Sequence, residues 1–219
     1  MTEAIQPHPS PFAESLTPLN IEALDETGQI AARALGELGF GVFMNLRRRD
    51  LPAVQAIAGQ QAVREFCPKD LTARFGDEIM TAAWYAKEPF FFQLRSLTEA
   101  ALAGYGWTRP EQKRSPELPH CDSTFAVRIS DEFAGRGLGT LFTVAIVSGS
   151  MALGMRNIGL ETWGSNIGAW RAYEKAGAVH VASRPDRRQT ILQKPDADGK
   201  IADVRRFMWF PQTSAPPPA

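Results

Sequence analysis

Apolar and polar residues follow two different periods along this chain, and the period changes at glycines, prolines and short polar clusters. Helical spacing predicts one helix over 20–38, a second that starts at Asp50 as N-cap and ends before Pro68, and a third that starts at Asp70 as N-cap and ends near Ala86. Two further helices are predicted after a glycine-rich turn at 134–140 and over 167–176. Strand-like runs occupy 41–46, 90–95, 101–108, 123–129, 157–163, 178–183 and 204–210.

Strands that alternate with helices, followed by a closing hairpin, predict an α/β (α+β) fold with one mixed sheet covered by helices on both faces. We expect six to seven strands, with a turn at 196–199 and a strand buried on both faces at 90–92. Proline-rich polar ends predict disorder over 1–18 and 211–219. The residues between them divide into a helical extension, 19–41, and a main domain, 42–210.

The most informative segment is Ala134-Gly135-Arg136-Gly137-Leu138-Gly139-Thr140, which follows the strand at 123–129 and opens an apolar helix. Its three glycines leave backbone N–H groups bare at a helix N-terminus, where partial positive charge accumulates. Such an arrangement suits a pyrophosphate. No Gly-Lys-Ser/Thr follows, which excludes a Walker-type nucleotide site.

A second segment, 166–177, places Asn166 at a helix start and Ala169 and Tyr173 four residues apart on one face. Together the two segments resemble the cofactor motifs of the GNAT superfamily of N-acetyltransferases, Gln/Arg-x-x-Gly-x-Gly/Ala and Asn-x-x-Ala-x-x-x-Tyr-x-x-x-Gly-Phe. From Gly139 to Asn166 is 166 − 139 = 27 residues, a usual spacing in that family. Two positions depart from the motifs: Ala134 replaces the Gln/Arg, and Ala178 replaces the Phe.

This resemblance, which covers roughly 42–210, implies a mostly antiparallel GNAT-like sheet and acetyl-CoA as co-substrate. It assigns the pyrophosphate to the turn residues Gly135, Arg136, Gly137, Leu138, Gly139 and Thr140. Where the fourth and fifth strands splay apart, the backbones of Val127 and Ile129 would hold the pantetheine arm. Asn166 would cap its helix or contact the pantetheine, and Tyr173 would act as general acid toward the leaving thiolate. Tyr173 could instead be a buried aromatic residue on an amphipathic helix.

The general base is less well defined by the sequence. Four titratable residues lie near the fourth and fifth strands: Glu117, His120, Asp122 and Glu161. His120 is preferred because the ordinary pKa of histidine is near neutral. The remaining alternatives are that these are surface or capping residues and that water relays the proton.

The charge and the cysteine content of the chain limit the classes of molecule that it is expected to bind. The 24 basic and 24 acidic side chains give a formal net charge of zero, so nothing favours nucleic acid as a partner. The arginines at 47–49 and 184–188 are interpreted as solvated charge. Cys67 and Cys121 lack metal-ligand spacing and are interpreted as free thiols in a reducing cytoplasm. The sequence predicts no metal, no signal peptide and no membrane span; a homodimer is possible.

These observations predict an N-acetyltransferase in which an amine attacks acetyl-CoA directly. Two alternatives stay open: a non-catalytic acyl-CoA-binding or interaction module, which the loss of the motif residue at Ala134 favours, and a protein-modifying acetyltransferase. The acceptor, a small-molecule or peptide amine, is not encoded in any recognisable pattern.

Overall fold

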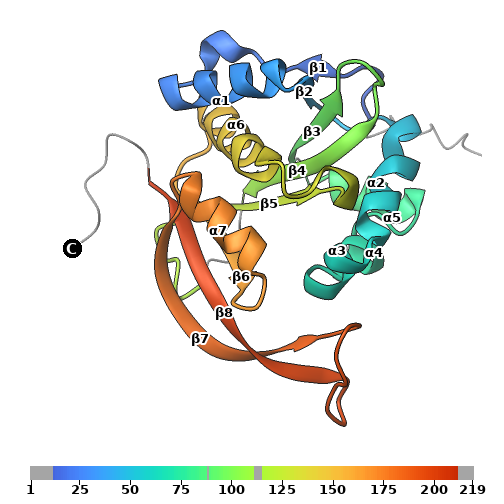
Figure 1. Cartoon of the computed structure of the whole chain (residues 1–219), viewed down its shortest axis with the longest axis vertical. Helices are drawn as coiled ribbons and strands as arrows, with labels where there is room; N and C mark the ends of the chain where they lie inside the picture. The colour runs from blue at the N-terminus through green and yellow to red at the C-terminus, as the bar shows by residue number, and fades with distance from the viewer. Residues whose placement is uncertain (1–11, 88, 111–114, 212–219) are drawn as a thin grey trace, which may run out of the picture.

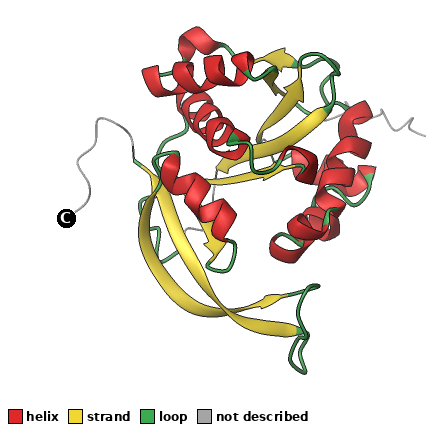
Figure 2. Ribbon diagram, viewed as in Figure 1, coloured by secondary structure: helices red, strands yellow, loops and turns green. Residues whose placement is uncertain are grey.

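The computed structural model describes residues 12–87, 89–110 and 115–211, which form a single sheet flanked by helices (Figures 1 and 2). The sheet order is β1-β2-β3-β4-β5-β6-β8-β7, and only the β5–β6 pair is parallel within the described residues. The strands are β1 Thr17–Pro18, β2 Phe40–Met44, β3 Phe90–Ser96, β4 Leu102–Pro110, β5 Ser123–Ile129, β6 Ile158–Trp163, β7 Val179–Gln189 and β8 Lys200–Phe210. The mixed, mostly antiparallel sheet is confirmed, with eight strands rather than six to seven because Thr17–Pro18 pairs with β2.

Helices cover both faces of this sheet, as predicted (Figure 2). One face carries α1 Glu26–Glu37, α6 Leu138–Ala152 and α7 Ile167–Lys175; the other carries α2 Leu51–Gly59, α3 Gln61–Phe66, α4 Lys69–Ala73 and α5 Glu78–Tyr85. Short 3₁₀ helices lie at Ile21–Ala23, Arg48–Asp50 and Asp131–Phe133. A hydrophobic core fills each interface between the sheet and a helical layer. The phenylalanine-rich strand β3 lies between the two layers, with Phe91 and Phe92 both buried.

The first and third helix starts differ from prediction, whereas the second is confirmed, with Asp50 as the N-cap residue of α2. The first helix begins after Asp25, not Asn20, and Asp25 accepts a hydrogen bond from the Gly28 N–H at 2.8 Å. Asp50 makes no capping bond; its buried carboxylate instead pairs with Arg47 at 2.7 Å. Asp70 lies inside α4 and is fully buried, so it does not cap the third helix. The side chains of Asp50 and Asp70 therefore bind arginines and cap no helix start.

The N-terminal residues that the structure describes are packed against the domain, although we expected disorder across 1–18. Phe12 is buried in the core beside α2 and α5, and the Ala13 N–H donates to the Leu46 carbonyl at 3.0 Å. Residues 1–11 and 212–219 lie outside the described residues. The expected extension 19–41 includes α1, which packs closely on α6: a Cβ at Gly28 would lie 2.1 Å from the Ser148 Oγ.

Strands β7 and β8 form a long curved hairpin, residues 179–210, which we call the arm (Figure 1). Its turn at 196–199 is confirmed by a hydrogen bond from the Gly199 N–H to the Asp196 carbonyl at 3.0 Å. The arm curves away from the sheet and its far end reaches the second helical layer.

A single carboxylate, Glu65 in α3, attaches the arm to that layer. It accepts hydrogen bonds from the Arg188 guanidinium, the Thr190 hydroxyl and the backbone N–H groups of Ile191 and Leu192. Arg188 also donates to Asp203 at 2.6 Å and is only 3% exposed. The interpretation of 184–188 as solvated charge is therefore wrong for Arg188, because a distant buried carboxylate compensates it.

Replacing Arg188 with Met should destabilise the protein far more than the same change at Arg187. Removing one partner of a buried pair leaves a charge without compensation, so we expect Arg188→Met to lower the free energy of unfolding by about 3 kcal/mol. Arg187 is about half exposed and pairs with exposed acids, so Arg187→Met should stay within about 0.5 kcal/mol of the wild type. Urea denaturation measures both. Equal losses in the two variants would contradict the role of the Glu65 contact.

Acid should weaken the attachment of the arm. Burial would raise the pKa values of Glu65 and Asp203, but hydrogen bonds from Arg188 and neighbouring groups outweigh burial and lower both. A lowered folded-state pKa gives stability above the unfolded-state value that is lost as pH falls through the folded value, here below about pH 4. Limited proteolysis within 190–199 should therefore accelerate at pH 3–4 relative to pH 7 under an acid-tolerant protease. An equal rate of cleavage at pH 3–4 and at pH 7 would show that ionised Glu65 and Asp203 do not hold the arm in place.

Candidate active site

The sheet opens between β5 and β6. These two strands are paired only at Ser123↔Ile158 and Thr124↔Gly159. Beyond that point β5 continues to pair with β4 as far as Ile129, whereas β6 pairs with β8. The edge of β5 that faces β6 therefore has no sheet partner over Phe125–Ile129 within the described residues. The predicted divergence of the fourth and fifth strands of the main domain is present here.

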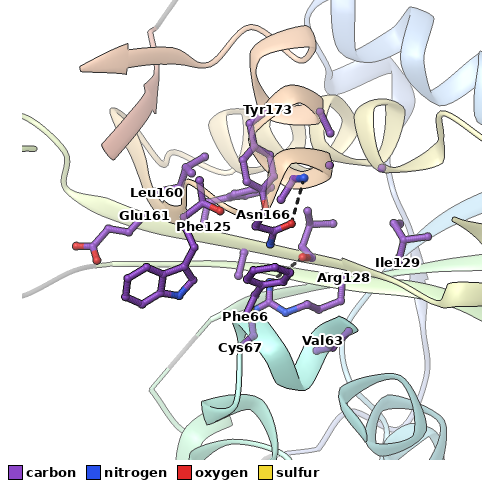
Figure 3. Close-up of a pocket in the computed structure, with 18 of the residues that line it drawn as sticks. Val63, Phe66, Cys67, Phe125, Arg128, Ile129, Leu160, Glu161, Asn166 and Tyr173 are labelled. Carbon is purple, nitrogen blue, oxygen red and sulfur yellow. Dashed lines mark hydrogen bonds between the residues drawn. The ribbon is translucent and has the colours of Figure 1, made fainter. Parts of the chain in front are cut away.

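A cavity of about 1240 Å³ occupies this opening. Figure 3 shows side chains from α3, β5, β6 and α7 around it, and residues 187–189 of the arm also line it. Val127 and Ile129, predicted to act through their backbones, are among its lining residues. The opening passes through the sheet, so one cavity is bordered by both helical layers.

The glycine-rich turn lies at one side of the cavity. Gly135 and Gly137 adopt positive φ angles of 77° and 79°, a conformation that favours glycine. Gly137 is the N-cap of α6 and makes no side-chain capping bond. The N–H groups of Gly137, Leu138 and Gly139 have no acceptor among the described residues, and they point out of a helix N-terminus. This is the geometry expected for an anion site.

Only some of the turn residues predicted to bind the pyrophosphate line the cavity. Gly135, Gly137, Gly139 and Thr140 line the cavity. By contrast, the Leu138 side chain is buried in the core. Arg136 is exposed and folds back, donating to the Glu132 carbonyl at 3.2 Å with its guanidinium 5.5 Å from the Phe133 ring centroid. The Arg136 side chain therefore does not replace the motif residue lost at Ala134 in this conformation.

Asn166 and Tyr173 enter the cavity from α7. Asn166 is the N-cap of that helix, and its Oδ1 accepts from the Ala169 N–H at 3.4 Å. Tyr173 is buried, and its ring meets Phe125 edge-to-face at 5.7 Å between centroids. Its hydroxyl end points from α7 into the opening (Figure 3). Burial raises the pKa of Tyr173 to about 12, so the phenol stays protonated at neutral pH.

On the opposite side of the opening lies a charged cluster that the sequence analysis missed. The buried Asp70 carboxylate accepts from Arg128 Nε at 2.8 Å, from Arg74 Nη1 at 2.7 Å and from the Tyr105 hydroxyl at 2.8 Å. Arg128 is the one charged residue in the otherwise uncharged strand 123–129. That interruption was the available signal, because a charge on a half-buried strand needs a partner. The partner lies 58 residues away.

Cys67 also lines the cavity on this side, below Arg128 in Figure 3. Burial raises the pKa of its thiol, so it is held as a neutral thiol rather than a thiolate. Neither Cys67 nor Cys121 is in a disulfide.

Of the four base candidates, only Glu161 lines the cavity. Glu161 is exposed and accepts from Arg205 at 3.0 Å. The Ser115 hydroxyl lowers the pKa of Glu117, and Arg184 also pairs with that carboxylate. His120 is exposed and does not line the cavity, and Asp122 accepts a long hydrogen bond, 3.3 Å, from the Ser123 hydroxyl.

Within the described part of the chain, no group of His, Cys, Asp and Glu has the arrangement of a metal site. No helix in the same residues is long and apolar enough to cross a bilayer.

Comparison with known structures supports the fold. The spermidine N-acetyltransferase from Vibrio cholerae, solved with CoA and spermine, matches with a TM-score of 0.59 at 17% identity, covering 78% of this chain and 95% of that one. A phosphinothricin acetyltransferase from Sinorhizobium meliloti, solved with acetyl-CoA, matches with a TM-score of 0.58 at 13% identity, covering 83% and 94%.

Sequence comparison identifies the family. A mycothiol acetyltransferase from Gordonia bronchialis is 30% identical over 114 residues, which are 50% of this chain and 35% of that protein. The chain thus spans about a third of the length of the curated relatives that it matches. The profile of the acetyltransferase (GNAT) domain matches residues 42–179, more than half of the chain. The match includes the opened strand pair, the glycine turn and Tyr173, and on this evidence the chain belongs to the GNAT acetyltransferase family.

Proposed function

We propose that this protein is an N-acetyltransferase that transfers the acetyl group of acetyl-CoA to an amine by direct attack. The observation that carries the proposal is that one cavity contains three features: the unpaired edge of β5, the bare N–H groups of the glycine turn, and the Tyr173 hydroxyl. These are a place for an extended acyl arm, an anion site and a proton donor. The relatives and structural neighbours support it, since they are named as acetyltransferases.

The residues present fit the co-substrate. Gly135, Gly137, Gly139 and Thr140 would hold the pyrophosphate through backbone N–H groups and the dipole of α6. The backbones of Val127 and Ile129 would bind the pantetheine arm in the manner of an added strand. Asn166 already caps α7, which leaves its amide nitrogen available to the pantetheine.

Tyr173 would assist departure of the CoA thiolate. A phenol with a pKa near 12 remains a donor throughout the physiological range. The CoA thiolate is less basic than the Tyr173 phenolate, so the proton stays mainly on the phenol. Tyr173 would therefore contribute a hydrogen bond that strengthens as negative charge develops on the sulfur. No histidine lines the cavity within the described residues, so for the general base we favour a water relay, with Glu161 as the one base candidate that lines the cavity and His120 as the weaker alternative.

The alternatives are less well supported. A non-catalytic acyl-CoA-binding or interaction module would not need Tyr173 directed into the opening. A protein-modifying acetyltransferase would need an open groove between the helices and the arm, but the Glu65 contact attaches the far end of the arm to α3. A small-molecule amine or a short peptide is therefore the proposed acceptor class. A cytoplasmic location, suggested by the two thiols outside disulfides, and a homodimer stay predictions.

Replacing Tyr173 with Phe should lower kcat by about 100-fold while the KM for acetyl-CoA stays nearly constant, because the hydroxyl acts mainly as the thiolate leaves. The ring remains, so the contact with Phe125 and the melting temperature should persist. The pKa near 12 also predicts that ionisation of Tyr173 causes no alkaline loss of wild-type activity below about pH 10. Steady-state kinetics across pH, with thermal melts, measure these effects. A loss of kcat below about threefold would show that Tyr173 only packs.

Charge introduced at the turn should weaken acetyl-CoA binding. Gly139 has an ordinary φ angle, and a Cβ there would meet only Ile129, at 3.6 Å, so both Asp and Asn should fit. Gly139→Asp should reduce affinity at least about tenfold relative to Gly139→Asn, because a carboxylate repels the pyrophosphate and cancels the helix dipole. Isothermal titration calorimetry compares the two isosteric variants. Equal affinities of the two variants for acetyl-CoA would show that the pyrophosphate does not bind at this turn.

A further inference from the structure

The arginines of the arm carry no surplus charge. Each of three is paired with two carboxylates: Arg187 with Asp196 and Asp198, Arg188 with Glu65 and Asp203, and Arg205 with Glu161 and Asp186. All three arginines line the cavity. Because each of the three is matched by two acids, the arginines of the arm offer no surplus charge to an added anion; the other arm cation that lines the cavity, Lys200, is exposed to solvent.

On the opposite side of the cavity, guanidinium groups outnumber carboxylates. Here one carboxylate, Asp70, is shared by two guanidinium groups, those of Arg74 and Arg128. We call these three residues the floor. Both arginines line the cavity, their side chains are only 22% and 12% exposed, and Asp70 is their only ion-pair partner among the described residues. Cys67 beside them holds a neutral thiol. The floor therefore carries one positive charge in excess, in a partly buried place where an unpaired charge is unfavourable.

Hydrogen-bond donors of Arg74, in the floor, and of Trp107, beside it, have no acceptor in the described residues. Arg74 uses Nη1 for Asp70, which leaves its Nε and Nη2 without a partner in the described residues. Its guanidinium lies 5.1 Å from the ring centroid of Trp107. Trp107 itself lines the cavity, and its buried indole Nε1 has no hydrogen-bond partner. Surplus charge and unused donors thus occur together, which is what an oxyanion site requires.

The floor lies on the other side of the sheet from the proposed pyrophosphate site. Along β5, Val127 and Ile129 pack with the core under α6, whereas Arg128 points the other way, to Asp70 in α4. The glycine turn and α6 are on the Val127 side. Tyr173 and Arg128 face each other across the opening (Figure 3). The floor therefore meets the reacting end of the cavity from the layer opposite the turn.

We infer that the acceptor amine carries a carboxylate or another oxyanion, and that Arg74 and Arg128 bind this group while the amine faces the thioester. The inference rests on the proposed acetyl transfer and narrows its acceptor to small amino acids and related anionic amines. A purely cationic amine would be repelled by the same surplus charge.

The first test is a matched panel of acceptors. L-methionine and L-phenylalanine, their carboxamides and the corresponding decarboxylated amines are assayed for CoA release, with spermidine as a polycationic probe. Because hydrogen bonds to a charged group are strong, we expect kcat/KM to be about 10- to 100-fold higher for the carboxylates than for the amides. Amides or spermidine accepted as well as the amino acids would overturn the inference and leave the acetyltransferase function intact.

The second test uses Arg74→Gln, which keeps a polar side chain and leaves the contacts of Arg128 in place. Its KM for the amino acid should rise about 10-fold or more while its KM for the amide is unchanged, so that the preference disappears. Arg74→Lys should recover part of it. Arg64→Gln, an exposed change of equal charge outside the cavity lining, should keep the preference. A preference that survives in Arg74→Gln, or is lost equally in Arg64→Gln, would contradict the assignment.

Binding of reaction products separates this inference from the proposed function. N-acetyl-L-methionine should bind the wild type at least about 10-fold more tightly than N-acetyl-L-methionine amide, and this difference should vanish in Arg74→Gln. Isothermal titration calorimetry needs no turnover to detect it. Absence of acetylation with this binding pattern intact would reject the catalytic function but retain the oxyanion site. Equal binding of the two products would reject the oxyanion site.

Discussion

The divergence of β5 from β6 is the constraint on which the other features of this molecule depend. A sheet strand that loses its neighbour exposes N–H and C=O groups that would ordinarily be paired, and such groups are unfavourable unless water or a ligand satisfies them. Here the two strands separate after Thr124 and Gly159, because β5 stays in register with β4 while β6 follows β8. Through the opening this creates, α7 on one face and α3 and α4 on the other border the same cavity.

Buried carboxylates, each binding several donors, fix the parts around this opening. Glu65 attaches the arm to α3, Asp70 joins α4 to β4 and β5, and Asp50 connects the segment before α2 to β3 through Gln93. An ion pair buried in this way contributes less to net stability than to a unique arrangement, since removing one partner is far more costly than forming the pair is favourable. The second helical layer consists of short helices, and such anchoring explains how it holds a defined position.

Local signals were sufficient to predict the segment from Ser123 to Gly177. Its strand ends, glycine turn and helix starts are marked by residues with strong backbone preferences, and β5, β6 and α7 were placed within a residue of their observed ends. The same reasoning misassigned Asp70 as a helix cap and Arg188 as solvated, and it missed that the carboxylate of Asp50 binds arginine and makes no capping bond at the start of α2. Each of the three also has a partner far along the chain, 45 residues away for Asp50, 58 for Asp70 and 123 for Arg188, and no local pattern reports such a partner. The positions of the glycine turn and Tyr173 were therefore predictable, and those of the floor were not.

This difference follows from how the two halves of the site are built. The turn and Tyr173 belong to the layer with α6 and α7, where consecutive elements of the chain present backbone groups and one side chain. The floor belongs to the other layer and is assembled from α4, β4 and β5 through side-chain contacts. The opening in the sheet lets both layers line one cavity. Substitutions at Asp70 or Arg74 would therefore change the charge that the floor offers to an acceptor without altering the backbone that would hold the co-substrate. In the proposed function, acceptor choice would therefore be separable from co-substrate binding, because one would depend on side chains of the floor and the other on backbone geometry.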